Sequence, residues 1–343
     1  MLAMRLYEKE DLRLVDHPKP EAKDFNAIIR VRATTICASD IKAYTSGKRT
    51  KIPITLGHEF AGDVVEAAEP FESYVGKRVI VNPDIFDGTC EYCLAGEHVF
   101  CPNRYAIGFD VDGSFAEYIE VPGQAFQVGG VLEIPDHISY EEASLVEPLS
   151  ACVRGQLKLN IKPGEVVTIL GCGPIGLMHF LLAKISGASK IIMTETNDRR
   201  IEMAKKIGVE HIINPAREDI DSMIHSLTSG RGSDVVIVAV AAPQAQKDAL
   251  RMARKGGRIN FFAGLVSSQE EVQINTNLIH YKQLTVLGTS MHTPAEFAKA
   301  LHLVSTGLIK LKPLITHTFR LSEGLEAFKN SLRGEGLKIP IIP

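Results

Sequence analysis

The sequence of 343 residues lacks several features that would mark whole classes of protein. It has no excess of basic residues. The formal net charge is −3, whereas nucleic-acid-binding proteins usually carry a positive excess that neutralises phosphates. It has no low-complexity tract, and 45% apolar and 23% charged residues are typical of a soluble globular protein. A small-molecule partner is therefore expected, and nucleic acid is not.

Long uninterrupted apolar runs are also scarce. Residues 1–16 carry charges throughout, which is not typical of a secretory signal peptide, so a cytoplasmic location is expected. One uncharged run, 166–183, is about long enough to span a membrane, but glycines, a proline and a histidine interrupt it. A buried strand followed by a helix explains this run better, and no membrane partner is expected.

The six cysteines do not suggest a disulfide framework, because a reducing compartment is expected and three of them are closely clustered. Cys90, Cys93 and Cys101 offer three thiolates at the short spacing of a closed tetrahedral zinc site. Asp87, three residues before Cys90, offers a carboxylate that completes the tetrahedron. The alternative is a set of reduced cysteines in a loop without metal. Reserve candidates for the fourth position are Glu97 and His98.

A second group of potential zinc ligands is dispersed along the chain. It consists of Cys37, His58, Glu59 and Glu147, which are suitable ligand types. Catalytic zinc commonly has three protein ligands and an open position, where it acts as a Lewis acid. Spacing alone does not establish such a site, because a lone cysteine or histidine is more often an ordinary core residue. The hypothesis of a catalytic metal depends on these four residues occurring together in one chain.

The pattern of predicted secondary structure changes near Pro148, which indicates two domains. The length of the chain suggests the same number. Up to about Gly130, short β-rich runs such as 27–33 and 76–81 predict an irregular all-β region. From Val166 onward, strands alternate with helices, which predicts a doubly wound parallel sheet. The strands are expected at 166–170, 190–195, 235–239 and 258–263, and the helices at 177–186, 199–207 and 244–252. A helix at 294–305, a strand at 315–319 and a helix from Ser322 should follow.

A glycine-rich turn follows the strand that ends at Leu170 and opens a helix. Its residues are Gly171, Cys172, Gly173, Pro174, Ile175 and Gly176. Such a turn lets the backbone and the helix N-terminus approach a pyrophosphate. Glu195, 19 residues after Gly176 at the end of the next strand, is placed to bind ribose hydroxyls. Its charge should repel a 2′-phosphate and favour NAD over NADP, although Arg199 or Arg200 offers a phosphate or adenine contact.

The motifs together resemble the medium-chain zinc alcohol dehydrogenase family, and particularly its sorbitol (L-iditol) and threonine dehydrogenase branch. The resemblance covers essentially the whole chain. Its motifs, in order, are Cys37-x-Ser39-Asp40, Gly57-His58-Glu59, the Cys90 to Cys101 segment, Gly113-x-Phe115-Ala116-Glu117-Tyr118, Glu147-Pro148-Leu149 and the glycine-rich turn.

The resemblance implies a fold of class α/β plus β. A GroES-like catalytic domain would occupy residues 1–147, with a structural zinc lobe near 85–103. A Rossmann NAD-binding domain would occupy 148–289, and the C-terminal segment 290–343 would return to the catalytic domain. A homo-oligomer, either a tetramer or a dimer, is also implied.

The resemblance also assigns roles to single residues. Cys37, His58 and Glu59 match the catalytic zinc ligands, and Glu59 can leave and return to the metal in this branch. Glu147 matches a carboxylate that binds the metal directly or through its water. The positions that match cofactor contacts are Ile175, Glu195 and Arg200, with Ala263, Gly264, Leu265, Thr289 and Ser290 lining the nicotinamide.

In the implied reaction, zinc stabilises the alkoxide of the substrate while a hydride passes to the nicotinamide. Ser39 matches the hydroxyl that passes the proton towards the nicotinamide ribose. Its alternative is a turn-forming serine beside Asp40. Relatives often continue this relay with a histidine where the chain has Lys42. A lysine with a lowered pKa would accept the proton, and the alternative is a solvated surface group.

The expected function is zinc-dependent oxidation of a secondary alcohol, foremost a polyol, to a ketone with hydride transfer to NAD. Ala43 and Met291 replace the Tyr and Arg contacts of sorbitol dehydrogenases, so other substrates stay open. These are L-threonine and a sugar-alcohol phosphate, as in galactitol-phosphate dehydrogenases, for which Lys48, Arg49 and Lys51 offer charge. From another class, the alternative is a catalytically silent protein that binds NAD and zinc.

Overall fold

The protein, described by a computed structural model over residues 1–23, 25–48, 50–265 and 268–343, divides into two compact units. Unit 1 is formed from both ends of the chain and comprises Met1–Ser150 and His292–Pro343. Unit 2 comprises Ala151–Met291. The sequence predicted these boundaries at residues 147 and 289, two or three residues earlier.

Unit 1 is built on β-sheets. Its main strands are β3 (Asn26–Thr35), β5 (Glu59–Ala67), β6 (Arg78–Val81), β9 (Tyr118–Pro122), β10 (Val131–Glu133), β17 (Phe319–Arg320) and β18 (Pro340–Ile342). They form a sheet in the order β10-β6-β5-β3-β18-β17, and β9 also pairs with β3. The other strands are β1 (Leu2–Glu8), β2 (Asp11–Asp16), β4 (Ile54–Thr55), β7 (Asp84–Ile85) and β8 (Tyr105–Ala106). They form a sheet in the order β2-β1-β4 and a separate β7-β8 pair.

The register of the main sheet brings the two ends of unit 1 together beside Thr35. Thr35 is the last residue of β3 and lies opposite Glu59, the first residue of β5. On the other side of β3, Thr35 lies opposite Pro340 of β18. The C-terminal tail therefore lies at the same end of β3 as Glu59.

The prediction of an all-β region up to Gly130 is wrong in part. The structure has α1 (Ala38–Ser46), α2 (Glu91–Leu94) and α3 (Gly123–Gln127) within it. The local cause of α1 is a cap that spacing arguments missed. Asp40 accepts a hydrogen bond at 2.8 Å from the backbone N–H of Cys37, and Gly47 ends the helix with a φ of +64°.

The remaining helices of unit 1 include those predicted near the C-terminus. They are α4 (Tyr140–Ser144), α11 (Pro294–Ser305) and α12 (Gly324–Leu332), with 3₁₀ turns η1 (Glu72–Tyr74), η2 (His98–Phe100), η3 (Lys312–Leu314) and η4 (Leu321–Glu323). α5 (Val146–Leu159) begins in unit 1 and ends in unit 2. The strand predicted at 315–319 is mostly wrong, because Ile315 makes only an isolated bridge to Lys338 and β17 begins at Phe319.

Unit 2 contains a parallel sheet with the strand order β13-β12-β11-β14-β15-β16. Its strands are β11 (Val166–Leu170), β12 (Lys190–Thr194), β13 (His211–Ile213), β14 (Ser233–Val238), β15 (Ala253–Phe261) and β16 (Thr285–Gly288). Its helices are α6 (Pro174–Ile185), α7 (Asp198–Ile207), α8 (Ile220–Leu227), α9 (Pro243–Met252) and α10 (Thr276–Lys282). The predicted doubly wound sheet is confirmed.

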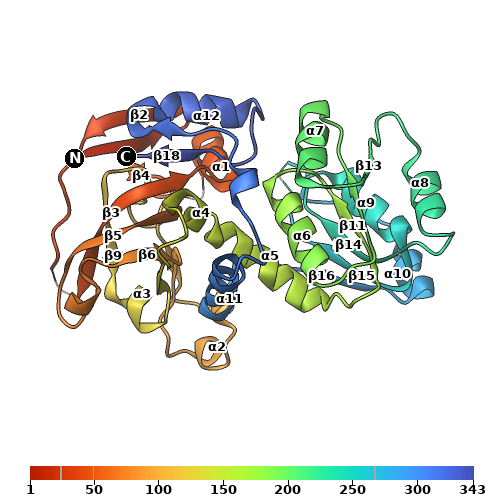
Figure 1. Cartoon of the computed structure of the whole chain (residues 1–343), viewed down its shortest axis with the longest axis horizontal. Helices are drawn as coiled ribbons and strands as arrows, with labels where there is room; N and C mark the ends of the chain where they lie inside the picture. The colour runs from red at the N-terminus through yellow and green to blue at the C-terminus, as the bar shows by residue number, and fades with distance from the viewer. Residues whose placement is uncertain (24, 49, 266–267) are drawn as a thin grey trace. The chain divides into compact units, whose positions relative to one another are not determined.

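Helices cover the sheet of unit 2 and complete its apolar core (Figure 1). α6 packs against β11 and β12, and α9 packs against β14 and β15. In chain order, β12 and β13 add to one side of β11, and β14 then adds to the other side, so the direction of strand addition reverses at β11. Ligands of such sheets bind at the carboxyl ends of the strands at this reversal. The uncharged run 166–183 forms β11 and most of α6, and none of the described helices has the length and apolarity needed to cross a membrane.

Candidate metal centres and dinucleotide site

Three donors from the dispersed group meet in unit 1. Cys37 precedes α1, His58 directly precedes β5, and Glu59 begins that strand. Each offers one ligand atom, and these three atoms all lie within 4.8 Å of one another. Sulfur, imidazole nitrogen and carboxylate oxygen are the ligand types that zinc accepts in catalytic sites. The residues present therefore fit a zinc ion.

Asp40 fixes the ring of His58. Its Oδ1 lies 3.2 Å from His58 Nδ1 and accepts a hydrogen bond from the backbone of Gly57 at 3.3 Å. Burial opposes the charged form, but Asp40 and Cys37 raise the pKa of His58 well above its ordinary value. The surroundings of the ring therefore favour positive charge. A carboxylate that orients a histidine in this way is a common support of metal ligands.

Ser39 and Lys42, the two predicted relay residues, both lie on α1. Ser39 Oγ lies 3.3 Å from His58 Nε2. The interpretation of Ser39 as a turn residue is wrong, because it belongs to the first turn of the helix. Lys42 is half-buried and follows Ser39 by three residues, so the two side chains leave the helix on neighbouring positions. Phe109 packs against His58, with 5.0 Å between the ring centroids.

Glu59 is held by a buried lysine that the sequence did not reveal. Lys338 Nζ donates to Glu59 Oε1 at 2.6 Å, and Thr35 Oγ1 donates to Glu59 Oε2. The side chains of Lys338 and Glu59 are 4% and 0% exposed. Burial opposes the ammonium, but the charges of Glu59 and then Cys37 raise the pKa of Lys338 above its ordinary value. Glu59 thus has a cationic partner within the protein, which competes with a metal for its oxygens.

Glu147 lies in the first turn of α5 and stands apart from the compact group of three donors. Its Oε1 lies 3.3 Å from His292 Nε2, a buried residue whose ring stacks on Phe297. Burial raises the pKa of Glu147, but its hydrogen bond with His292 and the charges of His292, His58 and Lys338 outweigh this and lower the pKa below its ordinary value. His292 was not predicted, because nothing in the local sequence indicates that it contacts Glu147.

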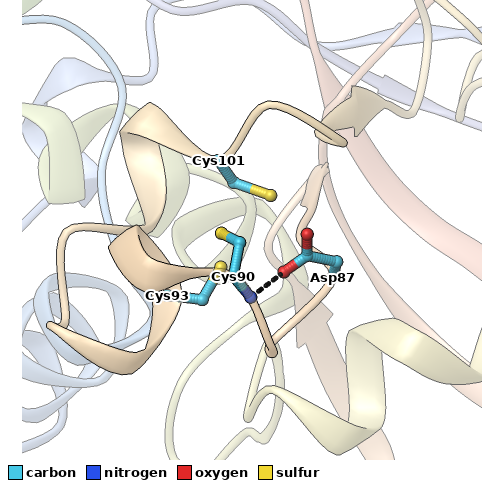
Figure 2. Close-up of side chains that lie close together, drawn as sticks. All are labelled: Asp87, Cys90, Cys93 and Cys101. Carbon is cyan, nitrogen blue, oxygen red and sulfur yellow. Dashed lines mark hydrogen bonds between the residues drawn. The ribbon is translucent and has the colours of Figure 1, made fainter.

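The four ligands predicted for the metal lobe also come together in unit 1. We use this name for Asp87, Cys90, Cys93 and Cys101, whose ligand atoms lie within 4.8 Å of one another. Figure 2 shows the carboxylate of Asp87 beside Cys90, whose backbone N–H donates to Asp87 Oδ1 at 3.0 Å. Burial raises the pKa of the Cys93 thiol to about 12. A bound dication would reverse that shift, because coordination deprotonates a thiol.

Asp87 has two separable roles, as a metal ligand and as an acceptor for backbone N–H groups. We expect Asp87→Asn to keep the hydrogen bonds from Thr89 and Cys90, at 2.9 and 3.0 Å, while removing the negative charge. If Asp87 is a ligand, zinc affinity of the lobe falls at least about tenfold, which competition with a chromophoric chelator measures. Asp110→Asn, a carboxylate outside the group of four, is the control. An unchanged affinity would assign Asp87 to the backbone role alone.

The glycine-rich turn of unit 2 has the backbone that the sequence predicted. Gly171 has a φ of +108°, and Gly173 precedes α6, whose first residue is Pro174. A Cβ atom at Gly176 would lie 1.9 Å from the carbonyl oxygen of Gly171, so no larger residue fits there. The turn follows β11 at the strand-order reversal, and its helix N-terminus offers partial positive charge to an anion.

Glu195 lies directly after β12 and is bound to this turn. Its Oε2 accepts from the backbone of Cys172 at 3.1 Å, and its Oε1 accepts from Thr196 and Asn197 at 2.8 and 3.0 Å. Arg200 Nη1 lies 3.9 Å from Glu195 Oε2. A carboxylate and a guanidinium therefore stand together beside the turn, where ribose hydroxyls and phosphate need opposite partners.

We expect Glu195→Gln to lower kcat/KM for NAD by about 10- to 100-fold, since hydrogen bonds to charged groups contribute about 1.5–3 kcal/mol. The preference for NAD over NADP should fall, because the repulsion of a 2′-phosphate is removed. Steady-state rates with both cofactors measure this. Glu202→Gln is the matched control, since Glu202 is an exposed carboxylate of α7 paired with Lys205. An unchanged cofactor ratio would contradict the role given to Glu195.

The residues predicted to line the nicotinamide lie at one edge of the sheet of unit 2. Ala263, Gly264 and Leu265 follow β15, while Thr289 and Ser290 follow β16. β15 and β16 are parallel neighbours, so both segments leave the sheet at its carboxyl edge. Asn260 Nδ2 donates to Thr289 Oγ1 at 2.8 Å and links the two segments.

The residues considered for substrate choice occupy varied places. Ala43 is buried in the core of unit 1. Met291 is the last residue of unit 2 and has a φ of +60°. Lys48 is exposed, and Lys51 is 75% exposed and lies 3.7 Å from Asp110. Arg49 lies outside the described residues.

A doubly wound sheet with a dinucleotide turn, and a separate β-rich unit with a zinc-type donor group, define the class of metal-dependent, nicotinamide-linked oxidoreductases. Comparison with known proteins agrees with this class. The alcohol dehydrogenase GroES-like domain matches residues 23–136, and the zinc-binding dehydrogenase model matches residues 174–306.

Relatives extend the match to the full chain. Sorbitol dehydrogenase of Bacillus subtilis is 32% identical, and the alignment covers 100% of this chain and 97% of the relative. L-Threonine 3-dehydrogenase of Caldanaerobacter subterraneus is 35% identical, with 99% and 98% covered. A crystal structure described as a zinc-binding dehydrogenase of Sinorhizobium meliloti 1021, bound to NADP, is 30% identical with a TM-score of 0.91, covering 100% of this chain and 99% of that one.

The chain belongs to the zinc-containing alcohol dehydrogenase family, whose members oxidise CH–OH groups with zinc and a nicotinamide dinucleotide. The resemblance inferred from the motifs is confirmed, and so is the combination of a GroES-like domain with a Rossmann domain.

Proposed function

We propose that this protein oxidises a secondary alcohol of a small polyol to a ketone, with hydride transfer to NAD. The observation that carries the proposal is the group of Cys37, His58 and Glu59, whose ligand atoms lie within 4.8 Å of one another. Residues from separate segments are brought together with a sulfur, a nitrogen and an oxygen donor. An ordinary apolar interior has no use for such a set.

Cys37 and His58 would hold the catalytic zinc, with Glu59 and Glu147 as its carboxylate partners. Zinc there would supply a Lewis acid that lowers the pKa of the substrate hydroxyl. The protein's own contribution is orientation. Asp40 lies 3.2 Å from the ring of His58, and Lys338 holds Glu59 at 2.6 Å.

Ser39 would take the hydroxyl proton of the substrate. Its Oγ lies 3.3 Å from His58 Nε2 and so stands at the edge of the donor group. Lys42, one turn further along α1 and half-buried like Ser39, is the proposed next member of the proton relay. A bound nicotinamide would supply the acceptor for the hydride of the carbinol carbon.

NAD is the proposed cofactor, supported by Glu195. Its two oxygens lie beside the glycine-rich turn and match the hydroxyls of an unphosphorylated ribose. Arg200 at 3.9 Å is the feature that would favour NADP, the cofactor bound to the Sinorhizobium meliloti relative. A carboxylate at the ribose position favours NAD, because it would repel a 2′-phosphate.

A polyol is the proposed substrate class because the sorbitol dehydrogenase relative aligns with the full chain. L-Threonine is the second candidate, supported by the threonine dehydrogenase relative at 35% identity. A sugar-alcohol phosphate is the third candidate. Lys51 would bind its phosphate only after breaking its present contact with Asp110, which is 3.7 Å away.

The proposal is tested by measuring NADH formation with sorbitol, L-threonine, galactitol phosphate and butanediol, each with NAD and NADP, alongside the zinc content. We expect two zinc ions per chain and the highest kcat/KM with a polyol and NAD. A higher kcat/KM with L-threonine would transfer the function to an amino alcohol. One zinc per chain and no alcohol-dependent NADH signal would instead indicate a catalytically silent binding protein.

A further inference from the structure

A side chain of β15 reaches the end of β16 at the carboxyl edge of the sheet of unit 2. Asn260 lies in β15, is fully buried, and donates from Nδ2 to Thr289 Oγ1 at 2.8 Å. The register of the two parallel strands ends with the pair Phe261 and Gly288. Thr289 is the next residue, so this bond extends the connection between the two strands by one residue beyond their last backbone pair.

The amide of Asn260 is closely packed by its neighbours. A Cβ atom at Gly155 of α5 would lie 3.1 Å from Asn260 Nδ2 and 3.1 Å from Phe262 Cδ2. Phe262 in turn packs edge-on against the ring of His179 in α6, with 4.6 Å between the centroids and planes 86° apart. All four residues belong to unit 2. The amide therefore has little space in which to reorient.

The stability of the fold does not explain an amide at this position. Asn260 Oδ1 has no hydrogen-bond partner among the described residues. A buried polar atom without a partner costs about 1–3 kcal/mol, which an apolar side chain of similar size would avoid. The hydrogen bond to Thr289 is therefore the interaction that requires an amide here.

Thr289 lies on the side of the sheet where the nicotinamide half of a dinucleotide would extend. The glycine-rich turn follows β11, and Glu195 follows β12, which lies on one side of β11. A dinucleotide with its adenosine half towards β12 extends its other half in the opposite direction, over β14 and towards β15 and β16. β15 is the second strand from β11 on that side, about 10 Å away at ~4.8 Å per strand.

We propose that Asn260 is a positioning residue for the nicotinamide, because it fixes Thr289 and the segment after β16 against the segment after β15. The inference rests on the proposed function, which assigns these two segments to the nicotinamide. Just past Thr289, Met291 has a φ of +60°, which is uncommon for residues other than glycine, so the chain turns away from the strand there. Without the bond, the segment loses its attachment where it turns, and only the nicotinamide half of the site is weakened.

The test compares NADH with ADP-ribose, which shares the adenosine and the pyrophosphate but lacks the nicotinamide. Calorimetric titration of the zinc-loaded full chain measures both dissociation constants. Thr289→Val removes the acceptor hydroxyl from a half-buried position. It should weaken NADH binding about fivefold, as the loss of one hydrogen bond does, and change ADP-ribose binding less than about twofold. Thr289→Ser keeps a hydroxyl and should bind NADH as the wild type does.

The matched control removes a similar bond from the other edge of the same sheet. Thr168 of β11 bonds Ser233, the first residue of the neighbouring strand β14, with 2.6 Å between the hydroxyl oxygens. Thr168→Val should therefore leave both dissociation constants unchanged. Asn260→Ala breaks the proposed bond from its other end, and its combination with Thr289→Val should add little to either variant alone.

Four results would overturn the role of Asn260 while leaving the proposed function intact. They are an unchanged NADH affinity in Thr289→Val, an equal loss of ADP-ribose affinity in that variant, the same selective loss of NADH affinity in Thr168→Val, and fully additive effects in the double variant. A wild-type chain that binds neither NADH nor ADP-ribose would overturn both.

Discussion

Replacing Cys37 by alanine is expected to remove the catalytic zinc and to lower alcohol oxidation at least about 1000-fold, since Lewis-acid stabilisation contributes several kcal/mol. The variant loses the sulfur donor of the compact group. Of the two remaining donors, Glu59 is bound to Lys338 at 2.6 Å, so His58 alone has no competing cation. NADH formation and the zinc content measure the two effects, and the content should fall from two ions per chain to one.

The control is a second thiol deletion outside both metal groups. Cys152→Ala removes the sulfur of a buried cysteine in α5, so it reports the effect of losing a thiol from the interior. We expect this variant to keep both zinc ions and most of its activity. Activity and two zinc ions retained in Cys37→Ala would show that the donor group does not hold the catalytic metal.

Replacing Lys338 by methionine is expected to lower the free energy of unfolding by about 3–5 kcal/mol, the usual effect of removing one partner of a buried ion pair. Methionine preserves much of the volume, but it leaves the carboxylate of Glu59 in the interior with no cation. Thr35 remains as its hydrogen-bond donor, which does not compensate a full charge. Urea denaturation of protein stripped of zinc by a chelator measures the loss, because no metal ion is then present to compensate Glu59.

Two further variants separate charge from packing. Lys338→Arg keeps the positive charge and should lose less stability than Lys338→Met. The combination of Lys338→Met with Glu59→Gln removes both charges and should recover at least half of the loss, because no uncompensated ion is left in the interior. A double variant no more stable than Lys338→Met would mean that packing, and not charge, makes Lys338 important.

Unit 2 was predictable because its signals are local. The strand and helix within 166–183 follow from an apolar run with glycines at fixed places, and the sheet follows from repeated strand–helix alternation. Gly176 is an example: the glycine-rich pattern predicts a tight turn there, and in the structure a Cβ atom at Gly176 would lie 1.9 Å from the carbonyl oxygen of Gly171. The family resemblance supplied the roles of single residues as metal ligands and cofactor contacts. It also implies a homo-oligomer, which stays a prediction.

The parts of unit 1 that escaped prediction depend on distant contacts. Lys338 and Glu59 are 279 residues apart, and His292 and Glu147 are 145 apart, so no window of sequence connects them. α1 was missed for the opposite reason. Its signal is a capping box, in which Asp40 lies three residues after Cys37, and the segment was interpreted only through its match to a zinc-ligand motif.

The formation of unit 1 from both chain ends has a consequence for biosynthesis. The six strands of unit 2 all lie within Ala151–Met291, so its sheet has every partner while the remainder is still being translated. The sheet of unit 1 instead lacks β18, and the carboxylate of Glu59 lacks its lysine, until residues 338–342 have been synthesised. A nascent chain therefore carries a complete unit 2 sheet before the main sheet of unit 1 has all of its strands.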